Sequence, residues 1–447
     1  MDSGDLIDLD ITDVAHGGVF VARHEGRVVF VADAIPGERV RARLTDTAKS
    51  SFWRAATVEV LDASPDRRAH VWAAADLDVD PDLRPGGADF GHITLERQRA
   101  LKQQVLRDAL ERFGGLTGPE VVVSGAAALH GADGEVLAAE SEDATGWRTR
   151  VSLHVDADGR VGPYAARSHR VVPVDDLPLA TAEIARAARE LTARPGRVDL
   201  VQPADGRVRI VPRPEAERAG RGRGRGRNRA GAPASAGRGR ADAAAEVVWE
   251  EAAGRRFRVD AGGFWQVHRL AAHTLTAVVA EALRELGGID DTAQHLDLYG
   301  GVGLFAATLG ELGGAATRVT SVESDPRATE HAGENLADWV GARAETARTD
   351  RFLARLNADA GAAERARLSR GVILLDPPRA GAGRAVVDGI AALAPASVVY
   401  VACDPVALAR DLGSFREHGY EPRRIEARDL FPHSHHVEAV AVLQRAE

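Results

Sequence analysis

Cysteine and lysine are almost absent from this chain of 447 residues: Cys403 is the single cysteine, and Lys49 and Lys102 are the only lysines. One cysteine excludes an internal disulfide framework and a cluster of cysteine ligands, so we expect a reducing, cytoplasmic setting. The sequence also lacks an apolar run long enough to cross a bilayer, and its acidic start has no signal-peptide pattern. These absences predict a soluble protein that does not bind a membrane.

An excess of positive charge is also missing, because the formal net charge is −9. This average argues against a general nucleic-acid binder, although the charged residues are unevenly spread along the chain. The length exceeds that of one ordinary core and predicts two or three domains. We place them at residues 1–62, 63–258 and 259–447.

The first segment alternates short apolar runs with turn signals at Gly17-Gly18 and Pro36-Gly37. Four or five strands at this spacing predict a small closed barrel, and such barrels often present a face to oligonucleotides. With GRVVFV at 26–31, these turns resemble the TRAM domain, an OB-like RNA-binding module. The basic residues on its strands either contact phosphates or form a solvated face: Arg39, Arg41, Arg43 and Arg54.

The middle segment contains an amphipathic pattern that predicts a helix over 96–115. A hairpin with its turn at 156–159 follows, and its arginines either face RNA or keep an exposed sheet soluble: Arg148, Arg150, Arg167 and Arg170. An insert at 214–245 includes eight arginines and no acid between Arg218 and Arg240. We expect this insert to be disordered, and either to bind RNA backbone non-specifically or to be a loop expansion without a role.

Residues 259–447 alternate strand and helix patterns, beginning with a strand at 296–299, a glycine turn and the helix LFAATLGEL. A second strand ends at Glu323, and RGVILLDPPR and SVVYVACDP supply two more. This alternation predicts an α/β fold with a doubly wound sheet that binds ligands at the carboxyl ends of its strands. An acid at the end of the second strand is the residue type that holds a ribose diol.

The glycine loop Gly301-x-Gly303 fits both a nicotinamide dinucleotide and S-adenosylmethionine, so it does not identify the cofactor by itself. The later motif LLDPPR has the base-facing form common in nucleic-acid methyltransferases, and no hydride-transfer constellation is visible. We therefore expect S-adenosylmethionine as the cofactor.

Cys403 is predicted at the junction of a strand over 398–402 and a helix that opens with Asp404 as N-cap and Pro405 in its first turn. A helix amino terminus can lower the pKa of a thiol below its usual ~8.5, so this position favours a reactive thiolate. The alternative is a buried structural cysteine.

Several motifs in the same order resemble the RNA 5-methyluridine (m5U) methyltransferase family: FWQVH at 264–268, DLYGGVGLF, VESD, DPPRAG, ACDPVALARDL and FPHSHHVE. Together with the TRAM-like start, the resemblance extends over most of the chain. It implies a Rossmann-like class I methyltransferase domain after an OB-like barrel and a small α+β middle domain. Ribosomal or transfer RNA is the implied partner, and we expect a monomer.

The resemblance also implies site residues. Cys403 would be the nucleophile and Glu438 the general base. The implied cofactor-binding residues are Gln266, Tyr299, Gly301, Gly303, Glu323, Asp350 and Asp376. The implied substrate-binding residues are Phe264, Gln266, Asp376, Arg379 and His436.

This pair of residue types suits the chemistry of uracil methylation. Uracil C5 is too weak a nucleophile to take a methyl group directly, whereas a thiolate added at C6 turns the ring into an enolate. A base must then remove the C5 proton so that the thiolate can leave. A stacked base is out of reach, so we expect a loop uridine or one that is flipped out. Beside an apolar strand, Glu438 is suited to a raised pKa; the alternative is an edge-of-strand charge.

Metal binding is not expected. His433, His435 and His436 follow one another on a proline-broken loop without cysteine or carboxylate ligands at metal-site spacing, so we predict no metal there. Some relatives hold a four-iron four-sulfur cluster through cysteines around a Cys-Gly-Gly-Cys run. The corresponding stretch here is Pro85-Gly86-Gly87-Ala88, so we predict no iron–sulfur cluster.

Three alternative functions stay open. RNA cytosine-5 methyltransferases often use a second cysteine for product release, which this chain lacks. A catalytically silent RNA-binding protein would not need both Cys403 and Glu438. A Rossmann dehydrogenase would not need the RNA-facing modules.

Overall fold

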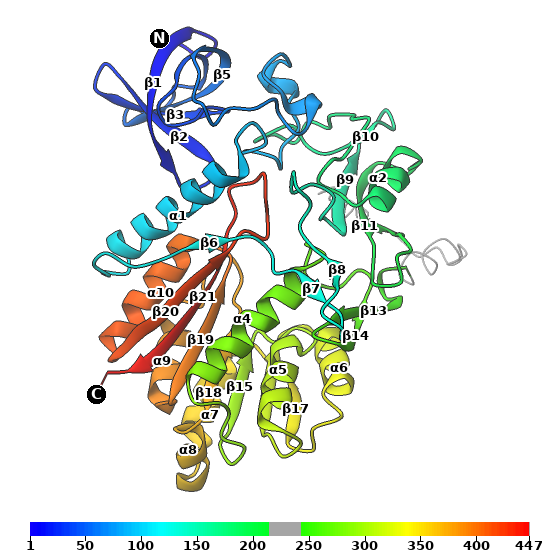
Figure 1. Ribbon diagram of the computed structural model, residues 1–447, viewed down its shortest axis with the longest axis vertical. Coiled ribbons are helices and arrows are strands. Elements are labelled where there is room, and N and C mark those ends of the chain that lie inside the picture. Colours follow the sequence, from blue (N-terminus) through cyan, green and yellow to red (C-terminus); the bar gives the residue numbers. More distant parts are fainter. Residues whose placement is uncertain (214–242, 447) are drawn as a thin grey trace, which may run out of the picture.

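The amino-terminal part of the chain forms five strands: β1 (Leu6–Ala15), β2 (Val19–His24), β3 (Arg27–Ala32), β4 (Arg39–Asp46) and β5 (Phe52–Asp62). In the computed structural model they close into a barrel with the order β1-β2-β3-β5-β4 (Figure 1). Alternate residues in the first part of β1 point inward, and Phe20 and Ile35 are buried among them. The predicted barrel is confirmed. The structure describes residues 1–213 and 243–446, so most of the insert predicted at 214–245 lies outside the described residues.

Eight strands form the large sheet: β6 (Val123–Ser124), β15 (His295–Leu298), β16 (Val319–Glu323), β17 (Ala342–Thr346), β18 (Val372–Leu375), β19 (Ser397–Ala402), β20 (Tyr420–Arg428) and β21 (Glu438–Arg445). Their order is β17-β16-β15-β18-β19-β21-β20-β6. The strands from β17 to β19 are parallel, whereas β21 is antiparallel to both of its neighbours. The strand order reverses between β15 and β18, which is where open α/β sheets bind their ligands. The predicted doubly wound fold is confirmed.

Helices cover both faces of this sheet: α1 (Leu95–Arg112), α4 (Ala271–Glu285), α5 (Leu304–Gly313), α6 (Pro326–Asn335), α7 (Thr349–Asp359), α8 (Ala362–Leu368), α9 (Arg384–Leu393) and α10 (Pro405–Glu417). One apolar cluster joins α1, α7, α9 and α10 to the sheet, and a second joins α4 and α5 to the opposite face. In β19, Val398 and Tyr400 belong to the first cluster, whereas Val399 and Val401 belong to the second. Because the strand is buried on both faces, its sequence is a continuous apolar run.

The middle part contributes the small elements η1 (Ala73–Ala75), η2 (Pro81–Leu83), β7 (Leu129–His130), β8 (Val136–Ala138), β9 (Arg150–Val155), β10 (Val161–Gly162), α2 (Ala182–Arg189), β11 (Gly196–Val201), β12 (Arg209–Arg213), β13 (Val247–Ala252) and β14 (Arg255–Asp260). The sheet order is β10-β9-β11-β12, and the turn at 156–159 closes the β9–β10 hairpin as predicted. Arg150 matches neither expectation for its side chain, which is only 11% exposed, pairs with Glu250 at 3.0 Å and donates to the Gly263 carbonyl.

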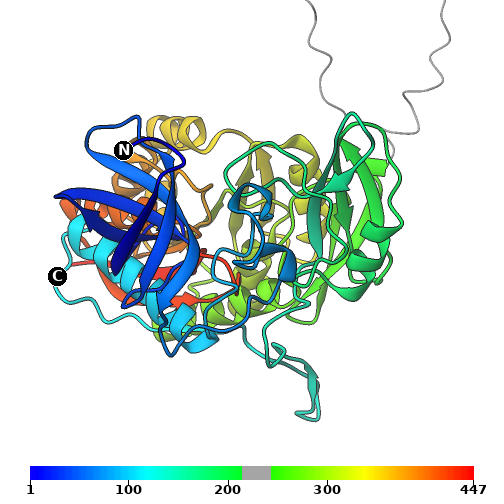
Figure 2. The same cartoon turned by 90° about the horizontal axis from the view of Figure 1, so that it is seen from above.

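The barrel and the middle part meet the large sheet through α1 and the segment before β21. Helix α1, predicted at 96–115, ends at Arg112 and packs against α10 and β1, while β6 extends the sheet beside β20. Viewed from above, the red segment before β21 lies between the blue barrel and the green middle part (Figure 2). The domain boundaries predicted at residues 62 and 258 stay a prediction. Helix α1 and strand β6 fall within the predicted middle domain, yet they pack with the third segment. No helix in the described part of the chain is both long and apolar enough to cross a membrane.

Ion pairs occupy part of the barrel's basic surface. Arg41 pairs with Asp8 and Glu59, and Arg43 pairs with Asp80. Because these two arginines are already paired with carboxylates, a solvated, charge-balanced strand face fits them better than direct contact with RNA phosphates. The roles of Arg39 and Arg54 stay predictions.

Candidate active site

Cys403 lies at the predicted junction, directly after β19 and before α10. Asp404 is the N-cap of α10, its carboxylate accepting a hydrogen bond from the Ala407 N–H at 2.8 Å, and Pro405 occupies the first turn. Asp and Pro at these positions start a helix, so the local sequence fixes where the buried strand ends. The thiol is half-buried at the carboxyl end of a parallel strand.

Glu438 is the first residue of β21, the antiparallel neighbour of β19. The register pairs Val401 with Val440 and Ala402 with Ala439. One step further along the same register, Cys403 stands opposite Glu438. The sheet itself therefore brings together two residues that are 35 positions apart in the sequence.

The pKa values at this junction are raised rather than lowered. Burial, followed by the charges of Glu438 and Asp376, raises the pKa of Cys403 to about 12. The expectation of a thiol with a lowered pKa is therefore wrong, because desolvation and neighbouring carboxylates raise the pKa more than Arg379 lowers it. Burial, followed by the charge of Asp376, also raises the pKa of Glu438 well above its ordinary value. The raised pKa expected for Glu438 is thus present.

Asp376 follows β18, the parallel neighbour of β19, and burial raises its pKa to about 7. Arg379, three residues later, supplies positive charge that partly offsets the effect of burial on the pKa values of Cys403 and Glu438. Its guanidinium contacts Nε2 of His436 at 3.1 Å. Four of the predicted site residues thus gather around Cys403: Glu438, Asp376, Arg379 and His436.

The segment before Glu438 is fixed by α1, which no motif in the sequence indicated. Lys102 and Asp429 are both fully buried and pair at 2.5 Å, and Lys102 also donates to the Phe431 carbonyl at 3.0 Å. Gln98 accepts from the His433 N–H at 2.7 Å. The scarcity of lysine was the one signal that could have singled out Lys102.

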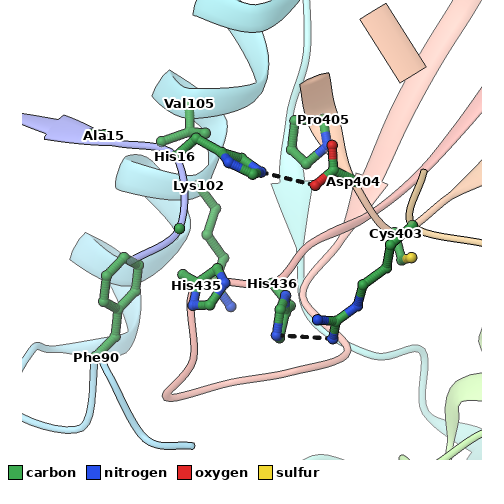
Figure 3. Close-up of a pocket in the computed structure, with 12 residues that line it drawn as sticks. Ala15, His16, Phe90, Lys102, Val105, Cys403, Asp404, Pro405, His435 and His436 are labelled. Carbon is green, nitrogen blue, oxygen red and sulfur yellow. Dashed lines mark hydrogen bonds and ion pairs between the residues drawn. The ribbon is translucent and has the colours of Figure 1, made fainter. Parts of the chain in front are cut away.

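These elements surround a cavity beside the thiol (Figure 3). Its walls come from the barrel, from the segment after η2, from α1, from the segment after β18, from the Cys403 turn and from the segment before β21. The lining residues are Ala15, His16, Gly17, Phe90, Lys102, Val105, Arg379, Cys403, Asp404, Pro405, His435 and His436. Polar side chains from separate parts of the chain thus line the cavity beside the thiol.

A second group of predicted residues lies at the other side of the strand-order reversal. The loop after β15 has positive φ at Tyr299, Gly301 and Gly303. A Cβ at Gly303 would come within 3.2 Å of Leu336, so a side chain there is both strained and crowded. The glycines therefore keep this loop tight against the sheet.

Carboxylates anchor the same loop. Glu323 accepts hydrogen bonds from the N–H groups of Gly301 at 3.2 Å, Ser324 at 2.5 Å and Asp325 at 2.9 Å. Asp297, which sequence reasoning missed, accepts from the Ala306 N–H at 3.1 Å, and its other oxygen is a buried acceptor without a partner among the described residues. A tight glycine turn beside the hydrogen-bonded Glu323 carboxylate fits the ribose of S-adenosylmethionine, whereas burial raises the pKa of Asp297 to about 7.

The remaining predicted residues lie around these two groups. Asp350 is in the first turn of α7, where it pairs with Arg348 at 3.0 Å. Phe264 and Gln266 lie in the segment between β14 and α4, and Phe264 is 74% exposed. Gln266 makes no hydrogen bond with any other residue that the structure describes. Their contributions stay predictions.

The three histidines near Glu438 separate into different contacts. His433 lies against Gln98, His435 bonds to Asp89 at 2.7 Å, and His436 contacts Arg379. Within residues 1–213 and 243–446, no three His, Cys, Asp or Glu side chains gather as metal ligands do. The expectation about metals stays a prediction.

Comparison with known proteins adds independent findings. A TRAM domain model matches residues 3–52, and a tRNA (Uracil-5-)-methyltransferase model matches residues 344–446. A protein of Streptomyces avermitilis, named an uncharacterized RNA methyltransferase, is 39% identical over 455 residues, which cover 99% of each chain. A Streptomyces coelicolor protein of the same description is 38% identical over 99% of this chain and 93% of its own.

The solved structure of the Pyrococcus abyssi tRNA (uracil-54, C5)-methyltransferase, in complex with S-adenosyl-L-homocysteine, has the same fold. It is 19% identical, with a TM-score of 0.64, and the match covers 97% of this chain and 99% of that one. Predictions of an enzyme, of RNA as its substrate and of a class I methyltransferase fold with a TRAM barrel are confirmed. The chain belongs to the uracil-5-methyltransferase family of RNA methyltransferases, S-adenosylmethionine-dependent enzymes with an amino-terminal TRAM domain.

Proposed function

We propose that this enzyme methylates C5 of a uridine in ribosomal or transfer RNA through a covalent intermediate on Cys403, with Glu438 as the base. The observation that carries the proposal is the β19–β21 register, which sets Glu438 opposite Cys403, a residue that lines the cavity. A covalent mechanism at uracil needs these two groups within reach of adjacent ring carbons, C6 and C5.

The protein itself must carry out two steps of this reaction, the addition of a thiolate at C6 and the removal of the C5 proton. The Cys403 thiolate adds to C6, and the electron pair of the C5–C6 double bond moves toward O4. S-adenosylmethionine, when bound, supplies an electrophilic methyl group for C5. Glu438 then removes the C5 proton, the electrons re-form the C5–C6 double bond, and the C6–S bond breaks to release the thiolate.

The electrostatics give each group its task. With a pKa of about 12, Cys403 stays a neutral thiol in the protein alone, which protects a half-buried nucleophile from side reactions. Arg379 already lowers this pKa, so ionisation of the thiol needs further positive charge near the turn. The raised pKa of Glu438 makes this carboxylate a stronger base than an exposed one, as removal of a carbon-bound proton requires.

The cofactor and the base have separate supports. In our proposal Glu323 holds the ribose, Gly301 and Gly303 admit the cofactor against the sheet, and Tyr299 and Asp350 flank its adenine. Asp376, Arg379 and His436 contact the uracil from the Cys403 side. Phe264 and Gln266 contact the cofactor or the target nucleotide from the segment before α4, where an exposed aromatic ring can stack on an unpaired base.

The test uses total RNA extracted from bacteria grown with 5-fluorouracil, incubated with the enzyme and S-adenosylmethionine. Fluorine at C5 does not leave as a proton does, so Glu438 cannot release the product and the complex stops as a methylated adduct. Intact mass and peptide mapping should place this adduct on Cys403, the single cysteine of the chain. Separate ribosomal and transfer RNA fractions identify the substrate class.

Absence of an adduct with every RNA fraction, while S-adenosylhomocysteine binds normally, would contradict the covalent mechanism. An adduct that lacks the added methyl group would show that the thiol attacks the base without the proposed transfer. Labelling with 5-fluorocytidine RNA but not with 5-fluorouridine RNA would instead favour cytosine as the target.

A further inference from the structure

The turn between β1 and β2 of the barrel reaches the active-site turn directly. His16 lies on this turn, and its Nε2 is 2.9 Å from Oδ2 of Asp404. Figure 3 shows this contact spanning the cavity wall between the barrel and the residue after Cys403. The barrel thus touches the chain one position from the proposed nucleophile.

Asp404 uses its two carboxylate oxygens for different partners. Oδ1 accepts the Ala407 N–H and starts α10, while Oδ2 faces His16. A hydrogen bond to each oxygen leaves the carboxylate little freedom to rotate. Because Asp404 is bonded covalently to Cys403, its orientation limits that of the preceding residue.

The same barrel turn packs on the other side of the cavity. A Cβ at Gly18 would come within 2.8 Å of Nδ1 of His435, so the turn lies in direct contact with that ring. His435 in turn bonds to Asp89 at 2.7 Å. The turn therefore contacts both the Cys403 segment and the segment that leads to Glu438.

The barrel does not depend on His16 for its attachment. Gln104 of α1 donates to Asp13 of β1 at 2.6 Å, and Phe20 of β2 packs on Phe90 with ring centroids 5.7 Å apart. These contacts anchor the barrel on α1 and on the segment after η2. Removal of the His16 side chain therefore leaves the barrel in place and deletes one specific contact.

We propose that His16 is a positioning residue for the methyl-transfer reaction: it holds Asp404, and through it the Cys403 turn, in the orientation needed for attack on C6. The barrel then completes the active site in addition to any contact it makes with RNA. This inference rests on the proposed function. When it is protonated, His16 also balances the Asp404 carboxylate, a negative charge that opposes thiolate formation at Cys403.

The test compares His16→Ala, His16→Gln and the control Arg23→Ala, an exposed residue on strand β2 that follows the same turn. Each variant is mixed with 5-fluorouridine RNA of the reactive fraction and S-adenosylmethionine, and the rate of Cys403 adduct formation is measured at saturating RNA. RNA affinity is measured separately by filter binding. Thermal melting of each variant checks that the fold is intact.

We expect His16→Ala to form the adduct about tenfold more slowly at saturating RNA, an effect of the size that a charge-assisted hydrogen bond supplies. Its RNA affinity should change less than about twofold. His16→Gln places an amide donor near the position of Nε2 and should recover most of the rate. Arg23→Ala should keep the wild-type rate.

A wild-type rate for His16→Ala overturns the inference, and so does a defect that vanishes at saturating RNA, because His16 would then serve RNA binding. Equal defects in His16→Gln and His16→Ala also contradict it, since the donor would not matter. Failure of the wild-type enzyme to form any adduct overturns the proposed function itself. The two failures are distinguishable, because the inference about His16 is tested only when the wild-type enzyme does form the adduct.

Discussion

The carboxyl edge of the large sheet holds carboxylates that differ in their hydrogen bonding. On the β15–β16 side, Glu323 accepts hydrogen bonds from the backbone N–H groups of Gly301, Ser324 and Asp325. On the β18–β21 side, Asp376 and Glu438 accept no hydrogen bond from any residue in the described ranges, and burial raises the pKa of both. The same edge therefore contains a fixed half at β15–β16, where N–H groups hold the Glu323 carboxylate, and an unpaired half at β18–β21, where the carboxylates of Asp376 and Glu438 accept no such bonds.

This difference in hydrogen bonding suits the carboxylates to different roles: those that accept N–H bonds to holding a ligand, and those that accept none to exchanging protons. A carboxylate that is bonded to N–H groups is stabilised in its charged form and makes a rigid acceptor. A desolvated carboxylate without such donors is a stronger base and can change its protonation state during a reaction. We expect the β15–β16 half to serve the cofactor and the β18–β21 half to serve the chemistry, and five measurements test this assignment.

The largest effect should come from Cys403→Ala, which removes the nucleophile. Methyl transfer should fall by at least about 10³-fold, because no other group of this chain can activate C6. S-adenosylhomocysteine binding, measured by calorimetry, should stay within twofold of wild type. Residual transfer above about 1% of the wild-type rate would show that the unpaired half acts without a covalent step.

Glu438→Gln should lower turnover about 10²- to 10⁴-fold by removing the base. Because the thiolate still adds and the methyl group still transfers, ordinary uridine RNA should now accumulate a methylated adduct on Cys403, visible by intact mass. The matched control is Glu421→Gln, on the neighbouring strand β20, which should turn over normally. Loss of activity without an accumulated adduct would place Glu438 before methyl transfer.

The pH dependence should show the raised pKa values of the unpaired half. At neutral pH the thiolate is a small fraction, since the pKa of Cys403 is about 12, and a protonated Glu438 cannot act as a base. The single-turnover rate should therefore rise steadily between about pH 6 and 9, by up to about tenfold per unit. Cofactor binding over the same range should change little. A rate that is already constant from pH 6 to 9 would mean a thiol pKa well below its ordinary value of about 8.5 and would contradict the raised pKa.

Glu323→Ala should weaken cofactor binding and leave the thiol unchanged. Loss of a charged acceptor for the ribose and for the Gly301 N–H should lower S-adenosylhomocysteine affinity by about 10- to 100-fold. Alkylation of Cys403 by iodoacetamide should keep its wild-type rate. Glu330→Ala, on the exposed side of α6, is the control, and equal affinities of both variants would remove Glu323 from the cofactor site.

The smallest effect should be on stability. The pKa of Asp376 is about 7 in the folded protein against 3.8 ordinarily, so the folded state binds more protons between these values and loses stability as pH rises through them. Asp376→Asn removes this loss and should raise the unfolding free energy at pH 8 by on the order of 1–3 kcal/mol, with no gain at pH 4. Thermal melting at both pH values measures it. Glu323→Gln should show no gain at pH 8, because its carboxylate is already stabilised by N–H donors.

Much of the fold could be predicted from local patterns. Asp404-Pro405 and Asp325-Pro326 mark helix starts that the structure confirms, and the apolar run at 398–402 is the buried strand β19. Glycine turns indicated both the barrel and the cofactor loop. These features follow from backbone preferences and burial, which act over a few residues.

Side-chain partners brought together from distant segments were not predictable in the same way. Arg150 was expected on a surface and is instead largely enclosed and paired with Glu250, because β9 packs beside the segment that follows β14. Lys102 and Asp429 form a buried pair across 327 positions of sequence. A local sequence pattern cannot predict a pair of residues so far apart in the chain, because such a pair depends on how complete helices and strands pack.

The sequence by itself determined the order of strands and helices, the glycine loop and the placement of Cys403 at the end of a strand. It also indicated the family, because the motifs of that family occur in the same order along the chain. Only the tertiary structure decided that β21 enters the sheet antiparallel beside β19, with Cys403 opposite Glu438, and that a barrel turn reaches Asp404. It also decided that the thiol has a raised pKa, because desolvation and the field of neighbouring carboxylates depend on three-dimensional proximity rather than on position along the chain.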